Sequence, residues 1–375
     1  MMRTSKMSFG MATTAMLVSP LALAQPDSSV QTEAGAVQVD ILAEGLVHPW
    51  GMAFLPDGRL LVTEREGRLR ILDSDNTLSA PVEGVPEVFN QGQGGLLDVA
   101  LDPDFQNNRR VYLSFAESGE GGASTALGRG RLENDRIEDF EVIFTQQPKV
   151  PGENHFGGRI AFTQQGTLFL TLGERFKFEP AQELSNHLGT IVHLNHDGSV
   201  PNDNPFVDRE DAEDEIWSYG HRNIESAAIH PETGQLWVAE MGPLGGDELN
   251  LPEAGRNYGW PVVSWGQNYD GSDIPDPPTH PDFADAIKHW TPVISPSGMV
   301  FYTGDVFQQW QGSALIGGLS AEAIVRVTND GQSVTGEERI PLGARIRDVE
   351  QGPQGNVYVL TDQQDGKVMR LSPLE

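Results

Sequence analysis

The sequence contains no cysteine, only five lysines and very little helical periodicity. Without cysteine there are no disulfides and no thiolate ligands for zinc, so stability must come from packing, aided at most by metal ions of other kinds. The 25 Lys+Arg residues are outnumbered by 54 Asp+Glu, which gives a formal net charge of −29. This charge argues against nucleic acids and anionic membrane surfaces as partners. Serine-centred nucleophile motifs and phosphate-binding glycine motifs are also absent.

The N-terminus has the pattern of an export signal. A basic start is followed by the small or apolar residues 11–23 and by a small-x-small cleavage pattern, Ala22-Leu23-Ala24. The apolar stretch is too short to span a bilayer, and a retained anchor is the less favoured alternative. The pattern predicts a signal peptide over residues 1–24 and a mature chain over 25–375, periplasmic or secreted and without stable membrane insertion.

One pattern occurs six times along the chain. An apolar stretch leads to a turn such as Asp-Gly or Gln-Gly and then to an alternating strand, which is typical of a β-hairpin. The copies begin near Trp50, Leu96, Gly157, Ile224, Pro296 and Arg345. Six related hairpins need neighbours to bury both faces, so they predict an all-β fold, a six-bladed β-propeller. Two packed sandwiches leave the likeness of the copies unexplained.

The segments between the copies are long at three places. A propeller brings the starts of all blades to one central axis, so long insertions are expected to form the walls of a cleft at its mouth. These insertions are residues 118–150, 175–220 and 255–295, of which only 180–189 looks briefly helical. The last insertion carries Trp260, Trp265 and Tyr269. Aromatic rings there are expected to stack on a ligand or to pack as structural aromatics.

Positive side chains gather near the starts of several copies. These residues are His155, Arg159, the string His221-Arg222-Asn223, Arg345 and Arg347. Any one of them alone suits a surface ion pair, but convergence on one axis predicts a site for an anionic ligand. His155 is in addition a candidate general base, because imidazole titrates near neutral pH.

The segment Glu240–Leu251, EMGPLGGDELNL, combines a Gly-Pro turn with acidic residues. Hard cations such as calcium prefer carboxylate and carbonyl oxygens, and glycine-rich turns expose carbonyls. The spacing is not that of an EF-hand, so this is a weak indication of a metal site.

Long strings of the sequence match a known family. Among them are GQGGLLDVALDPDF, NHFGGRIAF, IWSYGHRN, GGDELNLPEAGRNYGWP and RIRDV. With these strings the chain resembles the soluble, quinone-dependent aldose sugar dehydrogenases of the glucose/sorbosone dehydrogenase family over nearly the whole mature chain. The resemblance implies a six-bladed propeller that binds pyrroloquinoline quinone, a tricarboxylate, together with calcium. It also implies oxidation of the C1 hydroxyl of aldoses to lactones with hydride transfer to the quinone.

The resemblance assigns roles to individual residues. His155 is implied to be the base that removes the proton of the anomeric hydroxyl, and Arg222 to stabilise negative charge beside the reactive quinone carbonyl. Gln93 and Asn223 are implied to be further contacts to the cofactor. Arg345 and Arg347 are implied to be the pair that holds the cofactor's carboxylates. The backbone carbonyls of Gly242 and Pro243 are implied to bind the calcium ion that accompanies the cofactor. Glu248 and Tyr258 are implied to lie at a structural calcium site.

The sequence departs from the family pattern at three positions. A lysine that binds the cofactor in the family's glucose enzyme corresponds to a position near Ser320, so that cation is missing here. Glu225 stands where the family usually has a glutamine, and Asn154 stands where an acid often adjoins the catalytic histidine. A lost cation and a carboxylate beside an anionic cofactor predict weaker cofactor binding, unless calcium compensates.

Two other functions stay open from the residues alone. A calcium-dependent lactonase or esterase on the same fold leaves the arginines unexplained. A non-catalytic carbohydrate-binding propeller fits the departures at Glu225 and Ser320. The preferred sugar, the electron acceptor that reoxidises the quinone and the oligomeric state are not specified by the sequence.

Overall fold

The computed structural model describes residues 28–374. The signal peptide expected over residues 1–24 lies outside the described residues and stays a prediction. None of the helices within the described range has the length and apolar character needed to cross a membrane.

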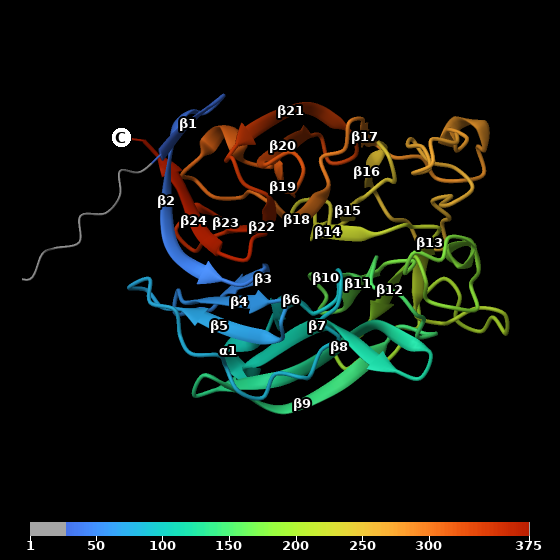
Figure 1. Cartoon of the computed structure of the whole chain (residues 1–375), viewed down its shortest axis with the longest axis horizontal. Coiled ribbons are helices and arrows are strands. Elements are labelled where there is room, and N and C mark those ends of the chain that lie inside the picture. The colour runs from blue at the N-terminus through green and yellow to red at the C-terminus, as the bar shows by residue number, and fades with distance from the viewer. Residues whose placement is uncertain (1–27, 375) are drawn as a thin grey trace, which may run out of the picture.

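Six antiparallel sheets surround a central axis, as expected from the repeats (Figure 1). The first three blades consist of β3 (Pro49–Phe54), β4 (Leu60–Glu64) and β5 (Arg68–Leu72); of β6 (Leu96–Leu101), β7 (Arg110–Gly119), β8 (Gly122–Glu133) and β9 (Arg136–Thr145); and of β10 (Gly157–Phe162), β11 (Leu168–Leu172), β12 (Thr190–Leu194) and β13 (Ile216–Tyr219). The fold is therefore a six-bladed β-propeller.

The remaining blades follow the same order from the axis outwards. They consist of β14 (Ile224–Ile229), β15 (Leu236–Glu240), β16 (Asp247–Asn250) and β17 (Lys288–Trp290); of β18 (Pro296–Phe301), β19 (Ala314–Gly318), β20 (Ala323–Asn329) and β21 (Val334–Pro341); and of β22 (Ile346–Gln351), β23 (Val357–Thr361) and β24 (Gly366–Pro373) with β2 (Gly35–Leu46) and β1 (Ser28–Thr32). The first strand of each blade coincides with the start of one sequence repeat.

Helical structure within the described residues is limited to four short segments. They are α1 (Phe105–Asn108) and the 3₁₀ turns η1 (Glu179–Gln182), η2 (Pro277–Thr279) and η3 (Gln308–Trp310). The helix suggested over 180–189 is thus a single turn. The segment 118–150 is also different from the expectation, because most of it pairs as β8 and β9 within the second blade instead of covering the mouth.

Each interface between neighbouring blades has its own apolar core. The six large clusters of buried side chains each combine residues from two adjacent blades. Apolar residues on both faces of each sheet account for this, since every sheet is packed between two others. The ring is closed by β2, which pairs with β24 from Val37↔Pro373 to Leu46↔Gly366, so both ends of the described part of the chain share one blade (Figure 1).

The first strand of every blade contains a β-bulge close to its start. The extra residues include Asp98 in β6, Arg159 in β10, Glu225 in β14 and Arg347 in β22. A bulge adds a residue to one strand and redirects its side chain, here towards the axis. The bulges therefore supply the charged groups of the central channel.

We expect the closing pair of strands to control stability. Leu371 in β24 is fully buried and faces Val39 of β2. Replacing it with alanine leaves a cavity in the closing interface, so Leu371→Ala should lower the free energy of unfolding by about 2–5 kcal/mol. Denaturant unfolding measures this, with Leu374→Ala as a control, since Leu374 is 47% exposed. Equal stability of both variants would contradict a packed closure.

Candidate functional site

His155 lies at the mouth of the channel, just before β10, and its side chain is buried. Its backbone N–H donates to Oε1 of Gln93 at 2.6 Å, and its ring Nδ1 lies 2.5 Å from Oε1 of Glu174. With the carboxylate accepting at Nδ1, the proton of the neutral ring resides there and Nε2 keeps its lone pair. Within residues 28–374 no side chain or backbone group bonds to Nε2, so this nitrogen is available to a ligand.

Electrostatics keep this pair in the form that a base requires. Burial lowers the pKa of His155, against the opposing hydrogen bond to Glu174, and the positive charge of Arg222 lowers it further. Burial raises the pKa of Glu174, but the hydrogen bond from His155, together with those from the backbone N–H groups of Phe178 and Lys177, outweighs burial and leaves this pKa below its usual value. A neutral imidazole beside an ionised carboxylate follows, which is the state that accepts a proton at Nε2.

Glu174 was not identified from the sequence, which pointed only to the missing acid at Asn154. It follows β11 by two residues, and its Oε2 accepts the backbone N–H groups of Lys177 and, at 2.7 Å, Phe178. A signal existed in the repeats, because the corresponding strands end in acids at Glu64 and Glu240. The acid that is missing beside His155 in the sequence, at Asn154, is thus provided in the folded protein by Glu174, which follows the next strand, β11.

Arg222 extends from the residue pair before β14 into the same mouth. Its NH1 donates to the carbonyls of Met241 at 2.9 Å and Gly242 at 3.0 Å, and its NH2 donates to the Tyr269 hydroxyl at 3.0 Å. Its Nε is buried without a partner. The neighbouring Asn223 accepts the Gly157 N–H at 3.1 Å. The Arg222 guanidinium is therefore held by neutral groups, and no carboxylate within residues 28–374 forms an ion pair with it.

Arg345 and Arg347 converge on one carboxylate. NH2 of each donates to Oδ2 of Asp362, at 3.2 Å from Arg345 and 2.9 Å from Arg347. Although burial alone raises the pKa of Asp362, the charge and hydrogen bond of Arg347 dominate and hold it far below its usual value. Arg345 has a 46% exposed side chain, whereas Arg347 is buried and its Nε has no partner.

Glu225 does not stand alone beside the mouth. Its Oε2 accepts NH1 of Arg347, and its Oε1 accepts Nδ2 of Asn223 at 3.0 Å. The ion pair neutralises the carboxylate that was expected to repel an anionic ligand. At the other departure, the Ser320 hydroxyl bonds to the Ser295 hydroxyl at 2.9 Å and brings no charge.

Arg159, grouped with these cations in the sequence, lies within the channel. Its NH1 lies 3.1 Å from Asp98 and 3.0 Å from Asp348, and its guanidinium stacks over Trp50 at 4.1 Å. Asp98, Arg159, Asp348 and Glu350 contribute to the lining of a cavity of about 340 Å³. Burial, opposed by Arg159, raises the pKa of Asp348 to about 7. Arg159 is thus neutralised by the protein itself and is not free for a ligand.

Three of the four residues expected to bind calcium, Gly242, Glu248 and Tyr258, line a small cavity beside Arg222, whereas Pro243 does not belong to its lining. Glu240, Gly242, Glu248 and Tyr258 contribute to the lining of this space of about 10 Å³. Burial, and then the like charge of Glu240, raise the pKa of Glu248 to about 8. The buried Oδ1 of Asn250 nearby has no partner. Oxygen-only donors with uncompensated charge fit a hard cation such as calcium.

Three of the residues expected to bind calcium can act only through their backbone. The Tyr258 hydroxyl donates to Leu251 O at 2.6 Å and accepts the Glu253 N–H at 3.1 Å, which leaves its main-chain carbonyl. The Gly242 carbonyl already accepts Arg222, with one lone pair remaining, and the Pro243 carbonyl accepts no hydrogen bond from the described residues. Asp247 fixes this turn by accepting the Gly242 N–H at 2.9 Å.

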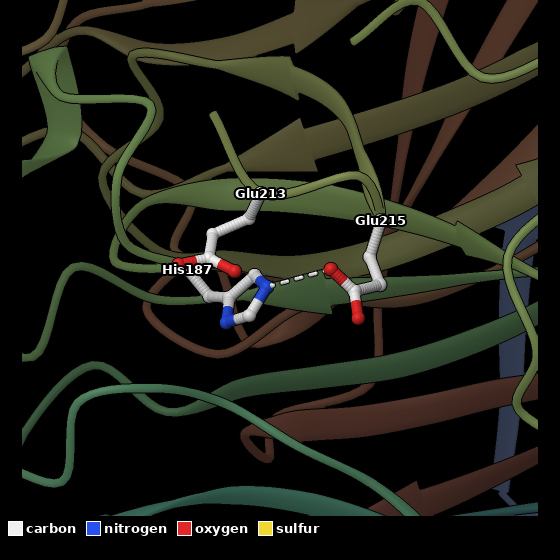
Figure 2. Close-up of side chains that lie close together, drawn as sticks. All are labelled: His187, Glu213 and Glu215. Atoms are coloured by element: carbon white, nitrogen blue, oxygen red, sulfur yellow. Dashed lines mark hydrogen bonds and ion pairs between the residues drawn. The ribbon is translucent and has the colours of Figure 1, made fainter. Parts of the chain in front are cut away.

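A second cluster of metal-binding residue types lies elsewhere in the fold, at His187, Glu213 and Glu215 (Figure 2). Nδ1 of His187 accepts the Gln147 N–H at 3.1 Å, and Nε2 lies 3.4 Å from Glu215. The neutral ring must then carry its proton on Nε2 and donate it to Glu215. No nitrogen lone pair is left for a metal, so this cluster is a hydrogen-bonded contact between loops.

Fold and mouth together define a class: a six-bladed propeller with a neutral histidine in an arginine-lined mouth. The family model described as Glucose / Sorbosone dehydrogenase matches residues 46–370, and the chain belongs to that family.

Individual relatives agree with this assignment. The chain is 44% identical over 354 residues to aldose sugar dehydrogenase YliI of Escherichia coli K12, covering 92% of this chain and 95% of that protein. A crystal structure of a glucose dehydrogenase shares 49% identity with a TM-score of 0.87, over 90% of this chain and 99% of that one. The PQQ-bound aldose sugar dehydrogenase from Streptomyces coelicolor shares 27% identity with a TM-score of 0.74, over 90% and 98% of the two chains.

The contact between His155 and Glu174 can be tested without a ligand. Because the hydrogen bond and charge of Glu174 raise the pKa of His155 against burial, Glu174→Gln should lower that pKa further. Histidine NMR titration measures it, with the exposed Glu183→Gln as the matched control. An unchanged or higher pKa in the Glu174 variant would show that the carboxylate does not act on the ring.

Proposed function

We propose that the protein oxidises the C1 hydroxyl of aldose sugars to the lactone, with pyrroloquinoline quinone as hydride acceptor. The observation that carries the proposal is the free Nε2 of neutral His155 beside Arg222 in a mouth lined by arginines. Family membership supports sugar oxidation as the reaction class, and the bound cofactor of the Streptomyces coelicolor relative supports the quinone.

The mouth suits an anionic cofactor. Nε of Arg222 and of Arg347 are buried without partners, which costs free energy unless a ligand accepts from them. Arg345 and Arg347 would hold the cofactor's carboxylates, and Gln93 and Asn223 would contact the rest of it. Gly242 and Pro243 would present carbonyls to the cofactor calcium, whereas Glu248 and Tyr258 would hold a structural calcium.

His155 and Arg222 would perform the chemistry of the chain itself. Nε2 of His155 takes the proton of the anomeric hydroxyl, and Glu174 stabilises the imidazolium that forms. Arg222 provides a positive charge, fixed by the Met241 and Gly242 carbonyls, where negative charge develops. The quinone, when bound, supplies the acceptor for the hydride. The reduced cofactor then requires an external electron acceptor.

The sugar would lie against an aromatic wall. Phe176 is 38% exposed and packs edge-on to His155 with ring centroids 5.1 Å apart, and Tyr269, 62% exposed, lies 6.4 Å from Phe176. Exposed rings beside a base suit the apolar faces of a sugar. Of the aromatic residues expected in the 255–295 insertion, Trp260 is buried beneath Arg222, and Trp265 stacks on His289.

The mature protein would be exported, with residues 25–375 forming the propeller. A calcium-dependent lactonase on this fold needs axial carboxylates that are free for the metal. Asp98 and Asp348 both contact the guanidinium of Arg159, which opposes that alternative.

The direct test is dye-linked oxidation of glucose and other aldoses by apo-protein, with and without pyrroloquinoline quinone plus calcium. His155→Ala should reduce kcat roughly 100-fold or more, since it removes the general base, while cofactor binding persists. The exposed His196→Ala serves as the control and should retain activity. Cofactor-dependent oxidation that survives in the His155 variant would reject His155 as the base.

The aromatic wall predicts a different kinetic effect. Tyr269→Ala should raise KM for the sugar about tenfold with a smaller effect on cofactor Kd, because it removes a ring face and one neutral partner of Arg222. Trp265→Ala, in the same loop but stacked away on His289, should leave KM nearly unchanged. Steady-state kinetics over a panel of aldoses distinguish the two variants, and equal KM changes would argue against the wall.

A further inference from the structure

Arg65 is a cation at the mouth that the sequence patterns did not single out. It directly follows β4, and its backbone N–H donates to His48 O at 3.2 Å while its carbonyl accepts the Leu96 N–H at 3.0 Å. Leu96 is three residues from Gln93, and His48 contacts Asp362 at 3.3 Å. Arg65 is thereby placed between Gln93 on one side and the Arg345–Arg347–Asp362 cluster on the other.

The guanidinium of Arg65 has no hydrogen-bond acceptor among residues 28–374, and its Nε is buried. Burial lowers the pKa of Arg65, with Asp362 opposing this effect and the charge of Arg347 adding to it. The other mouth arginines are all engaged, Arg347 with two carboxylates, Arg345 with one of them and Arg222 with carbonyls. Arg65 as a whole is half-buried, but a buried Nε that donates to no acceptor costs free energy unless a ligand accepts from it.

The charges of the mouth leave an excess that matches an anion. The four guanidinium groups of Arg65, Arg222, Arg345 and Arg347 outnumber the three carboxylates Glu174, Glu225 and Asp362, in a chain whose formal net charge is −29. Ser320, where a cation was expected, bonds to Ser295 and to Val293 O. The first blade thus provides a positive group that the fifth blade lacks.

We infer that Arg65 binds a carboxylate of the anionic cofactor and takes the place of the cation missing at Ser320. The inference rests on the proposed function, since it needs a carboxylate ligand in the mouth. A guanidinium suits this role because its planar donors match a carboxylate, and Arg65 has donors to spare.

A binding role and a structural role differ in the ligand-free protein. Removing Arg347 would leave Glu225 and Asp362 without their partner, so it should destabilise the apo-protein. Removing Arg65 leaves no hydrogen-bond acceptor without its partner. It ends the burial of the guanidinium and the repulsion from Arg347, and it also removes the attraction to Asp362 and Glu225. Arg65→Gln should therefore leave the apo-protein Tm nearly unchanged while it weakens ligand binding.

The experiment is a titration of calcium-containing apo-protein with pyrroloquinoline quinone, followed by calorimetry or tryptophan fluorescence. Losing one charge-assisted contact should raise Kd about 10- to 100-fold in Arg65→Gln. Arg65→Lys, which keeps the charge, should recover part of the affinity. Arg59→Gln is the matched control, because Arg59 is an arginine of the same blade that pairs with surface Asp57 and Asp135.

The outcomes separate the two levels of the proposal. If the wild-type protein and Arg65→Gln bind the quinone with equal affinity, the role of Arg65 is overturned and the proposed function stays intact. If both Arg65 variants bind more weakly and also have a lower Tm, or if both fail to fold, Arg65 has a structural role. Either result overturns its role in binding the cofactor. Wild-type protein that does not bind the quinone rejects the proposed function and the inference together.

Discussion

The architecture of the mouth depends on one backbone device, the β-bulge at the start of each inner strand. A bulge leaves an N–H group outside the regular ladder, and in the first three blades a buried hydroxyl of the second strand accepts it. Thr63 accepts the Gly51 N–H at 2.8 Å, Ser114 that of Asp98 at 2.9 Å, and Thr171 that of Arg159 at 2.9 Å. Each hydroxyl also donates to a carbonyl of the next blade, at Leu97, Gly158 and Ile224 respectively. The same side chains therefore satisfy the bulges and join the blades.

Charged residues on the axis become tolerable because of this arrangement. The bulges bring Arg159, Glu225 and Arg347 close together, where cations and carboxylates alternate between the blades. Arg159 donates to the backbone carbonyls of Glu225 and Arg347 and so connects the inner channel to the mouth. Buried charges of this kind are stable only when partners are provided, and positive charge remains uncompensated only at the open end.

The sequence was sufficient for features that depend on local patterns. Six hairpins with turn residues predicted the blades, and scarce cations near their starts predicted Arg222, Arg345 and Arg347 at the mouth. Features that depend on tertiary pairing were missed. Glu174 approaches His155 from the next strand, and the strand over 35–46 resembles no repeat although it closes the ring. Residues 118–150 were wrongly expected to form a wall of the mouth, whereas most of them form β8 and β9 of the second blade. A long hairpin and a long loop give the same spacing between two repeats, so the spacing could not distinguish them.

Closure of the ring has a consequence for the order of assembly. Strand β2 lies near the beginning of the described chain and β24 at its end, so their pairing is the most non-local contact in the fold. Such contacts form late, because the intervening chain must first be ordered. Arg347 belongs to the sixth blade, which contains this junction, and Arg65 belongs to the first blade, which follows β2 in the chain. A chain without β24 therefore cannot hold both guanidinium groups in place, and the complete mouth exists only once this strand has paired with β2.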